Sequence, residues 1–196
     1  MDYKRKEENK MYLIVGLGNP EEEYSNTRHN MGFDAVNKLA KQYNIEVDRK
    51  NFKGIYGIGT IENQKVIILK PQTYMNLSGE SIVEVLKFYK INLEDLIVIY
   101  DDMCIEPSKI KIRKKGGAGS HNGMKSVVQQ LDSEKFTRIR VGIGEPLDKN
   151  EMIEYVIGKI SSEEDQKRLD TGTTQAKEAI IEIIKNGVDS AMNKFN

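Results

Sequence analysis

Short apolar runs alternate along the chain with longer segments in which apolar residues recur every three or four positions. The run at 96–100, LIVIY, is apolar throughout, which is typical of a strand buried on both faces of a sheet. Further runs predict strands at 12–15, 52–61, 66–69, 109–113 and 136–144. Helical spacing predicts helices at 33–43, 82–89 and 125–131. A capping-box pattern at 161–164 opens a last helical region, which we expect Gly187 to close and the pair Thr171-Gly172 to kink.

Strands that alternate with helices are typical of an α/β domain with a largely parallel, buried sheet. The length of 196 residues fits one such domain. Seven of the first ten residues are charged, so we interpret residues 1–10 as a flexible N-terminal extension and residues 11–196 as the single domain.

Polar side chains follow several of the predicted strands, at the ends where ligands bind in sheets of this kind. They are Asn19, after 12–15; Asn76, after 66–69; Asp101, after 96–100; and His121-Asn122, after 109–113 and a glycine-rich loop at 116–123. His29, one of two histidines, lies between the first strand and the first helix. If the strands are parallel, these side chains converge at one edge of the sheet.

An imidazole, a carboxylate and three carboxamides form a set suited to hydrolysis. His29 can take a proton from water, because the unperturbed pKa of imidazole, ~6.5, lies near neutral pH. Asp101 can fix the tautomer of that imidazole, and carboxamides can donate hydrogen bonds to a developing oxyanion. Other interpretations stay open: Asn76 and Asn122 could be helix caps, Asn19-Pro20 a plain turn, and His29 an ordinary loop or core residue.

Two other kinds of site find little support in the sequence. Cys104 has no neighbouring histidine that would mark a catalytic thiol. The two histidines stand 92 positions apart, which is not a metal-ligand spacing. We therefore predict neither a metal nor another cofactor.

Basic residues form a second pattern. In the segment 109–113, KIKIR, the cationic side chains alternate with isoleucines, so in a strand they share one face. Arg138 and Arg140 repeat this alternation in the segment 136–141. Two cationic strand faces beside a glycine-rich loop could bind phosphates. Solvated charges that discourage strand aggregation would give the same pattern.

Composition narrows the class of protein. The net charge is zero, so a nucleic-acid site would have to come from local patterning rather than from a global field. A single cysteine excludes an internal disulfide framework and is typical of a reducing compartment. The sequence has neither a membrane-spanning apolar run nor a signal-peptide pattern, so we expect a cytoplasmic protein without a membrane partner.

Several motifs follow one another in a characteristic order: LIVGLGNP, Tyr24, TRHN, PQTYMNLSGES, YDD, KKGGAGSHNG, RIRVGIG and the C-terminal MNKFN. In this order they resemble the bacterial-type peptidyl-tRNA hydrolases, over about residues 11–196. That family hydrolyses the ester between a peptide and the 3′ end of tRNA and so recycles tRNA. The resemblance implies a monomeric, metal-free α/β domain with a twisted mixed sheet.

The resemblance also implies roles for individual residues. His29 would be the catalytic base and Asp101 its partner. Substrate contacts would come from Asn19, Tyr24, Met75, Asn76, His121 and Asn122. The phosphates of tRNA would be bound by Lys111, Arg113 and Arg140. Two positions depart from the family pattern, Glu21 after Asn-Pro and Ser120 before His-Asn, and both bear on the mouth of the site.

Two other classes of protein would account for parts of this pattern. A dinucleotide-binding oxidoreductase is suggested by Gly16 and Gly18 after a strand, but Glu21 stands where the fingerprint needs its third glycine. A non-catalytic RNA-binding module would explain the basic strands but would leave His29 and Asp101 without a role.

Overall fold

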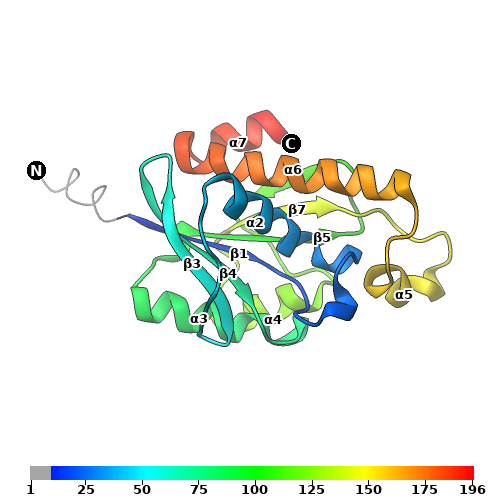
Figure 1. Cartoon of the computed structure of the whole chain (residues 1–196), viewed down its shortest axis with the longest axis horizontal. Helices are drawn as coiled ribbons and strands as arrows, with labels where there is room; N and C mark the ends of the chain where they lie inside the picture. The colour runs from blue at the N-terminus through cyan, green and yellow to red at the C-terminus, as the bar shows by residue number, and fades with distance from the viewer. Residues whose placement is uncertain (1–9) are drawn as a thin grey trace, which may run out of the picture.

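Seven strands form one mixed sheet in the order β2-β3-β4-β1-β5-β7-β6 in the computed structural model, which describes residues 10–196 (Figure 1). The strands are β1 (Met11–Gly16), β2 (Arg49–Asn51), β3 (Gly54–Ile61), β4 (Gln64–Pro71), β5 (Leu96–Asp102), β6 (Ile110–Arg113) and β7 (Thr137–Gly142). The four central strands β4, β1, β5 and β7 are parallel, whereas β2, β3 and β6 join by antiparallel pairing. The predicted fold class is confirmed.

Within residues 10–196, six α-helices accompany the sheet: α2 (Met31–Gln42), α3 (Ser78–Tyr89), α4 (Asn122–Leu131), α5 (Met152–Ile157), α6 (Glu163–Asn186) and α7 (Val188–Phe195). Helices α2, α6 and α7 cover one face, α3 and α4 cover the other, and α5 lies at the end of the molecule beyond the sheet (Figure 1). Short 3-10 turns occur at Glu22–Tyr24, Arg28–Asn30, Met75–Leu77, Leu93–Asp95 and Lys149–Glu151.

The predicted strand at 52–61 was wrong in its extent, because a hairpin turn falls inside it. Phe52 and Lys53 both have positive φ angles, 55° and 50°, and connect β2 to β3. Positive φ at both central residues is the geometry of a type I′ turn, usually marked by Asn-Gly. The sequence has Phe-Lys at these two positions instead of Asn-Gly, so it did not indicate the turn. Asn51 Oδ1 supports the turn by accepting a hydrogen bond from Phe52 N at 2.8 Å.

The last helical region also differs in detail from the prediction. Its cap is Ser162 rather than Ser161, since Ser162 Oγ accepts a hydrogen bond from Asp165 N at 3.3 Å. Helix α6 continues without a break through Gly172, where the missing Cβ lets it approach Val141 of β7 (Figure 1). Gly187 ends the helix as predicted, with φ of 89°. Helix α5 was not predicted.

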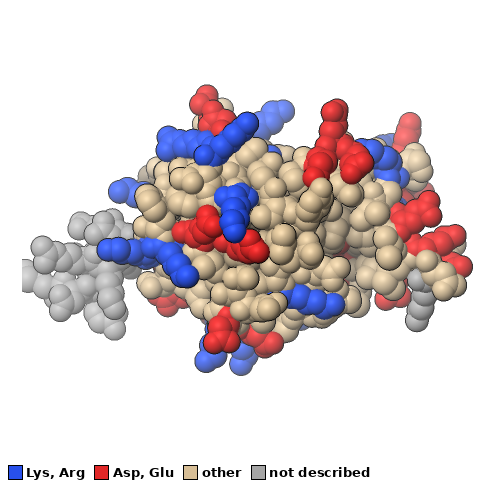
Figure 2. All heavy atoms as spheres, turned by 90° about the horizontal axis from the view of Figure 1, so that it is seen from below, with Lys and Arg blue, Asp and Glu red and all other residues tan. Residues whose placement is uncertain are grey.

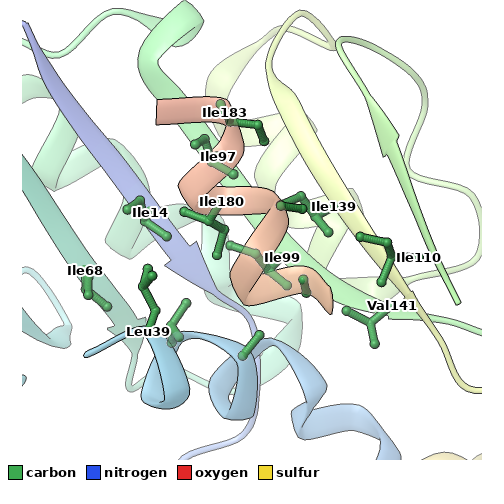
Figure 3. Packing of buried hydrophobic residues seen from close by; sticks show 14 of the residues in the cluster. Ile14, Leu39, Ile68, Ile97, Ile99, Ile110, Ile139, Val141, Ile180 and Ile183 are labelled. Carbon is green, nitrogen blue, oxygen red and sulfur yellow. The ribbon is translucent and has the colours of Figure 1, made fainter. Parts of the chain in front are cut away.

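Alternate residues of the strands enter two separate cores. On one face, Ile14, Ile97 and Ile99 of the strands pack against α2 and α6. Leu39 of α2 and Ile180 of α6 belong to the same core (Figure 3). The residues between them on the strands pack against α3 and α4, and include Leu13, Val15, Leu96, Val98 and Tyr100. Burial on both faces explains why 96–100 is apolar throughout.

The N-terminal extension predicted at residues 1–10 lies, for residues 1–9, outside the described residues. Lys10 is described and forms an ion pair with Asp95 at 3.2 Å. Among residues 10–196, every helix is too short or too polar to cross a membrane.

Candidate active site

His29 and Asp101 meet at the carboxyl ends of β1 and β5 because α2 packs unusually close to the sheet. A Cβ on Gly32 would lie 2.4 Å from both Ile99 O and Leu17 N, so only glycine permits this approach. The turn that precedes Gly32 then carries His29 over β5, where its Nδ1 lies 2.9 Å from Asp101 Oδ1 and 3.1 Å from Oδ2.

Both groups have perturbed protonation equilibria. Burial alone would lower the pKa of His29, but the charge and hydrogen bond of Asp101 outweigh it and raise that pKa above its ordinary value. Burial likewise opposes the charged form of Asp101, yet the charges and hydrogen bonds of His121 and His29 hold its pKa well below the usual range. Asp101 is therefore an ionised carboxylate that faces two imidazoles.

The tautomer of His121 follows from its two hydrogen-bond partners. Its Nδ1 accepts a hydrogen bond from Met124 N at 3.2 Å, which caps the N-terminus of α4. The proton of the neutral ring must then be on Nε2, which donates to Asp101 Oδ1 at 3.0 Å. The ring is held further by Tyr100, whose centroid lies 4.9 Å away in an edge-on arrangement.

His121 reaches this point by a different route from the one predicted. We expected it to follow a parallel strand, but β6 is antiparallel to β7 and its carboxyl end points away from the site. The loop at 114–121 returns the chain. Arg138 holds that loop by donating from Nη1 to Gly117 O at 3.1 Å and from Nη2 to Glu134 O at 2.9 Å. Arg138 is thus a buried structural residue.

The three predicted carboxamides occupy different environments. Asn19 is buried, its Oδ1 accepts a hydrogen bond from Met75 N at 3.0 Å, and its backbone exchanges two hydrogen bonds with the Asn30 side chain. Asn76 and Asn122 are exposed. Neither is a helix cap, because Leu77 and His121 occupy the N-cap positions of α3 and α4, so the capping interpretation was wrong.

A cavity of about 280 Å³ opens beside the two histidines. Its polar side is formed by His29, Asp101, Asp102, His121, Asn122 and Arg140. Its other side is apolar and comes from Met103 and from Met152, Ile153, Val156 and Ile157 of α5. Four predicted substrate contacts lie outside this cavity: Asn19, Tyr24, Met75 and Asn76. Met75 is buried and packs against Gly123, where a Cβ would lie 2.6 Å from its Sδ.

Sequence reasoning missed several residues that build this site. Asn30 fixes the backbone of Asn19 and Tyr100 packs against His121, and only the three-dimensional contacts identify them. The apolar wall had a weak signal, since apolar residues stand at 152, 153, 156 and 157 with helical spacing. Ile153 is 75 % exposed, so this face is not part of the core.

The predicted cationic residues do share one face of the sheet, beyond the edge of α4. Lys111 lies directly opposite Arg140, and Arg113 opposite Arg138. Arg140 is not a bare charge, since its Nε lies 2.7 Å from Asp102 Oδ2. Seen from the side of α3 and α4, Lys and Arg side chains are interspersed with Asp and Glu (Figure 2). Any attraction for phosphate is therefore local.

His29, Asp101 and His121 bring three potential metal ligands within 4.8 Å of one another. The chemistry of the donors disfavours a metal at this point. His121 Nε2 carries the ring proton as long as Nδ1 accepts from Met124 N, so ligation through Nε2 would need an imidazolate or the loss of that cap. The arrangement suits proton transfer.

Comparisons with known proteins match one family over almost the whole chain. A family model described as "Peptidyl-tRNA hydrolase" matches residues 13–196. Proteins named peptidyl-tRNA hydrolase from Clostridium acetobutylicum and Clostridium botulinum are each 53 % identical over 95 % of this chain, and 98 % and 97 % of their own lengths are covered. The crystal structure of peptidyl-tRNA hydrolase from Acinetobacter baumannii superimposes with a TM-score of 0.88 at 39 % identity, over 95 % of this chain and 94 % of that chain. A peptidyl-tRNA hydrolase complexed with N-propanol gives a TM-score of 0.89 at 38 % identity, over 95 % and 94 % of the two chains.

Proposed function

The chain belongs to the peptidyl-tRNA hydrolase family and hydrolyses the ester bond of peptidyl-tRNA, and we propose that His29 is the general base that activates the attacking water. The observation that carries this proposal is the short contact between His29 Nδ1 and Asp101, at 2.9 Å, beside the cavity. Since Nδ1–H donates to the carboxylate, the lone pair of Nε2 is left for a water molecule.

The reaction then needs no covalent intermediate on the enzyme. His29 Nε2 takes a proton from water as the water oxygen attacks the ester carbonyl. Asp101 stabilises the imidazolium that forms, as the orienting carboxylate does in catalytic triads. Collapse of the tetrahedral intermediate expels the 3′ oxygen of tRNA, which receives the proton from His29. The products are a peptide with a free carboxylic acid, which then ionises to solvent, and a tRNA with a free hydroxyl.

The carboxamides bind the substrate around this centre. Asn122 lines the cavity and can donate to the developing oxyanion. The Oδ1 of Asn19 is engaged by Met75 N, which orients its amide so that Nδ2 can donate to substrate. Asn76, Tyr24, Met75 and His121 complete the substrate contacts that the family resemblance implies.

Lys111, Arg113 and Arg140 bind phosphates of the tRNA backbone in this proposal. Their common face on β6 and β7 continues from the cavity, where Arg140 is a lining residue. Phosphate contacts suit an enzyme that accepts many tRNAs, because they carry no direct sequence information. The protein works in this proposal as a cytoplasmic monomer without a cofactor.

Family membership decides against the two other classes, a non-catalytic RNA-binding module and a dinucleotide-binding oxidoreductase. The mechanistic proposal is tested by hydrolysis of an N-acyl-aminoacyl-tRNA by the wild-type protein and by His29→Ala, with and without a chelator. We expect His29→Ala to lose ~10²–10⁴-fold in kcat while tRNA affinity stays close to wild type. A His29→Ala variant that retains most of its kcat would show that another group, with His121 the next candidate, is the base.

A further inference from the structure

Arg28, directly before His29, is buried and makes contacts that the reaction scheme does not use. Its Nη2 lies 2.6 Å from Asp165 Oδ2, in the first turn of α6. Its guanidinium stacks on the ring of Tyr155 in α5, with Cζ 4.0 Å from the ring centroid, and its Nη1 lies 3.5 Å from Tyr155 O. One side chain thus joins the turn that carries His29 to two other helices.

Tyr155 is itself fixed to the sheet. Its hydroxyl donates to Ile143 O, at 2.6 Å, just beyond the end of β7. The next residues along α5, Val156 and Ile157, line the apolar side of the catalytic cavity. A displacement of Arg28 relative to Tyr155 would therefore change the separation between the imidazole and the wall that it faces.

Other contacts already attach the preceding loop to the segment at 159–166. Asn26 and Ile160 exchange backbone and side-chain hydrogen bonds, and Thr27 forms a bridge with Lys159. Arg28 adds to these a contact with α5. It does so at a cost, because its Nε is buried and has no hydrogen-bond partner among the described residues.

We propose that Arg28 is a positioning residue, which sets the place of His29 relative to the α5 wall through Tyr155 and Asp165. Substrate held between the wall and the imidazole then stays at reacting distance from the activated water. The inference rests on the proposed role of His29 as base. Displacement of a reacting group by ~1 Å costs on the order of 10²-fold in rate, so a loosened Arg28 contact affects turnover before it affects binding.

The test compares Arg28→Gln and Arg28→Lys with a matched control, Asp170→Asn. Asp170 also links α2 to α6, through Lys38 at 2.6 Å, but its side chain is exposed and lies outside the catalytic cavity. Each variant is assayed for kcat and KM on N-acyl-aminoacyl-tRNA, and its melting temperature is measured. We expect kcat to fall ~10–100-fold in Arg28→Gln and less in Arg28→Lys, with KM changed less than threefold and Asp170→Asn unaffected.

A second readout reports the position of His29 without relying on activity. The chain has only two histidines, so imidazole ¹H–¹⁵N spectra can be assigned with His121→Asn. We expect the His29 Nδ1–H signal to shift or broaden in Arg28→Gln and to stay in place in Asp170→Asn. An unchanged signal together with wild-type kcat, at any melting temperature, would overturn the proposal.

If Arg28→Gln does not fold, Asp165→Asn and Tyr155→Leu remove the two partners and leave Arg28 in place. Either variant should then reduce kcat and move the His29 signal, and wild-type behaviour of both would refute the inference. Activity retained in His29→Ala would instead refute the proposed function, whereas the imidazole spectra still decide whether Arg28 positions His29.

Discussion

Among individual residues, Asp101 has the largest effect on the charge of the site. Its one buried carboxylate accepts hydrogen bonds from both histidines. Its neighbour Asp102 has a different task. Asp102 Oδ2 lies 2.7 Å from Arg140 Nε, and its Oδ1 accepts from Cys104 N at 2.9 Å. Of the two adjacent carboxylates at the end of β5, Asp101 therefore binds the two imidazoles and Asp102 binds Arg140 of the cationic face.

Asp101→Asn is expected to lower kcat more than Asp102→Asn does. In the proposed mechanism His29 must be unprotonated to act as the base, so the rate should rise with pH through the pKa of His29, which Asp101 raises. Loss of the charge lowers that pKa, and the acid limb of the kcat/KM profile should move to lower pH while its plateau falls. Asp102→Asn should instead act mainly on KM, through Arg140. Profiles of both variants against pH check this, and equal kcat losses would contradict the pairing of Asp101 with His29.

At the scale of elements, the site depends on how closely α2 and the sheet approach. Gly32→Ala should force α2 away from β1 and β5, because the new Cβ would meet backbone atoms at 2.4 Å. We expect a loss of ~1–3 kcal/mol in stability, as for other overpacked sites, and at least a tenfold fall in kcat. Gly117→Ala is the control, since its Cβ would be 3.5 Å from the nearest atom. The melting temperature and kcat of both variants test this prediction. If Gly32→Ala lost no more stability and kcat than Gly117→Ala, the close approach of α2 to the sheet would not be what positions the site.

A second prediction at this scale concerns the cationic face of β6 and β7. Arg113 is exposed, so Arg113→Ala should raise KM, leave kcat nearly unchanged and reduce the salt dependence of binding by a slope of ~0.7–0.9, about one phosphate contact. A minimal ester without the tRNA body should be indifferent to this variant. Arg138→Ala should instead disturb the 114–121 loop and affect both substrates, because Arg138 is buried beneath it. If Arg113→Ala slows the minimal ester as much as peptidyl-tRNA, the phosphate role fails.

For the molecule as a whole, a carboxyl group that does not line the catalytic cavity, Asp34, contributes to the pH dependence of stability. Asp34 of α2 lines a second cavity, of about 300 Å³, which α6 also borders. Burial raises the pKa of Asp34 to about 6, although Lys38 and Lys70 oppose the shift. The raised pKa favours the folded protein below about pH 4, and this contribution is lost as the pH rises through about 6.

Asp34→Asn should therefore stabilise the protein at pH 7 and leave its stability unchanged near pH 3.5. We expect a gain of ~1 kcal/mol at pH 7, a modest figure because the side chain is only partly buried. Asp170→Asn should show no such gain, because the weak repulsion of Asp34 that it relieves is offset by the loss of the ion pair with Lys38 at 2.6 Å. Thermal unfolding at the two pH values measures both, and an Asp34→Asn variant no more stable than wild type at pH 7 would contradict the assignment.

The ends of the apolar runs were readable in the sequence, because a strand buried on both faces must be apolar until it reaches its loop. That is why Asn19 and Asp101 could be placed at one edge of the sheet, and why the α/β class followed from the alternation of strands and helices. The identity of His29 as a candidate base followed in the same way, from residue chemistry and its place after the first strand. The family resemblance was carried by the same local motifs.

Only the tertiary structure decided how distant segments meet. The antiparallel direction of β6, the return of the 114–121 loop and the protonated Nε2 of His121 depend on pairings between residues far apart in the chain. So does the division of the two arginines of β7, one buried beneath a loop and one paired with Asp102. Alternation along a strand places both on one face, but which neighbour covers each is set by loops and helices from other parts of the chain. The wall of α5 was missed for this reason, since its short apolar pattern includes no buried residue and only the cavity that it borders shows what those residues contact.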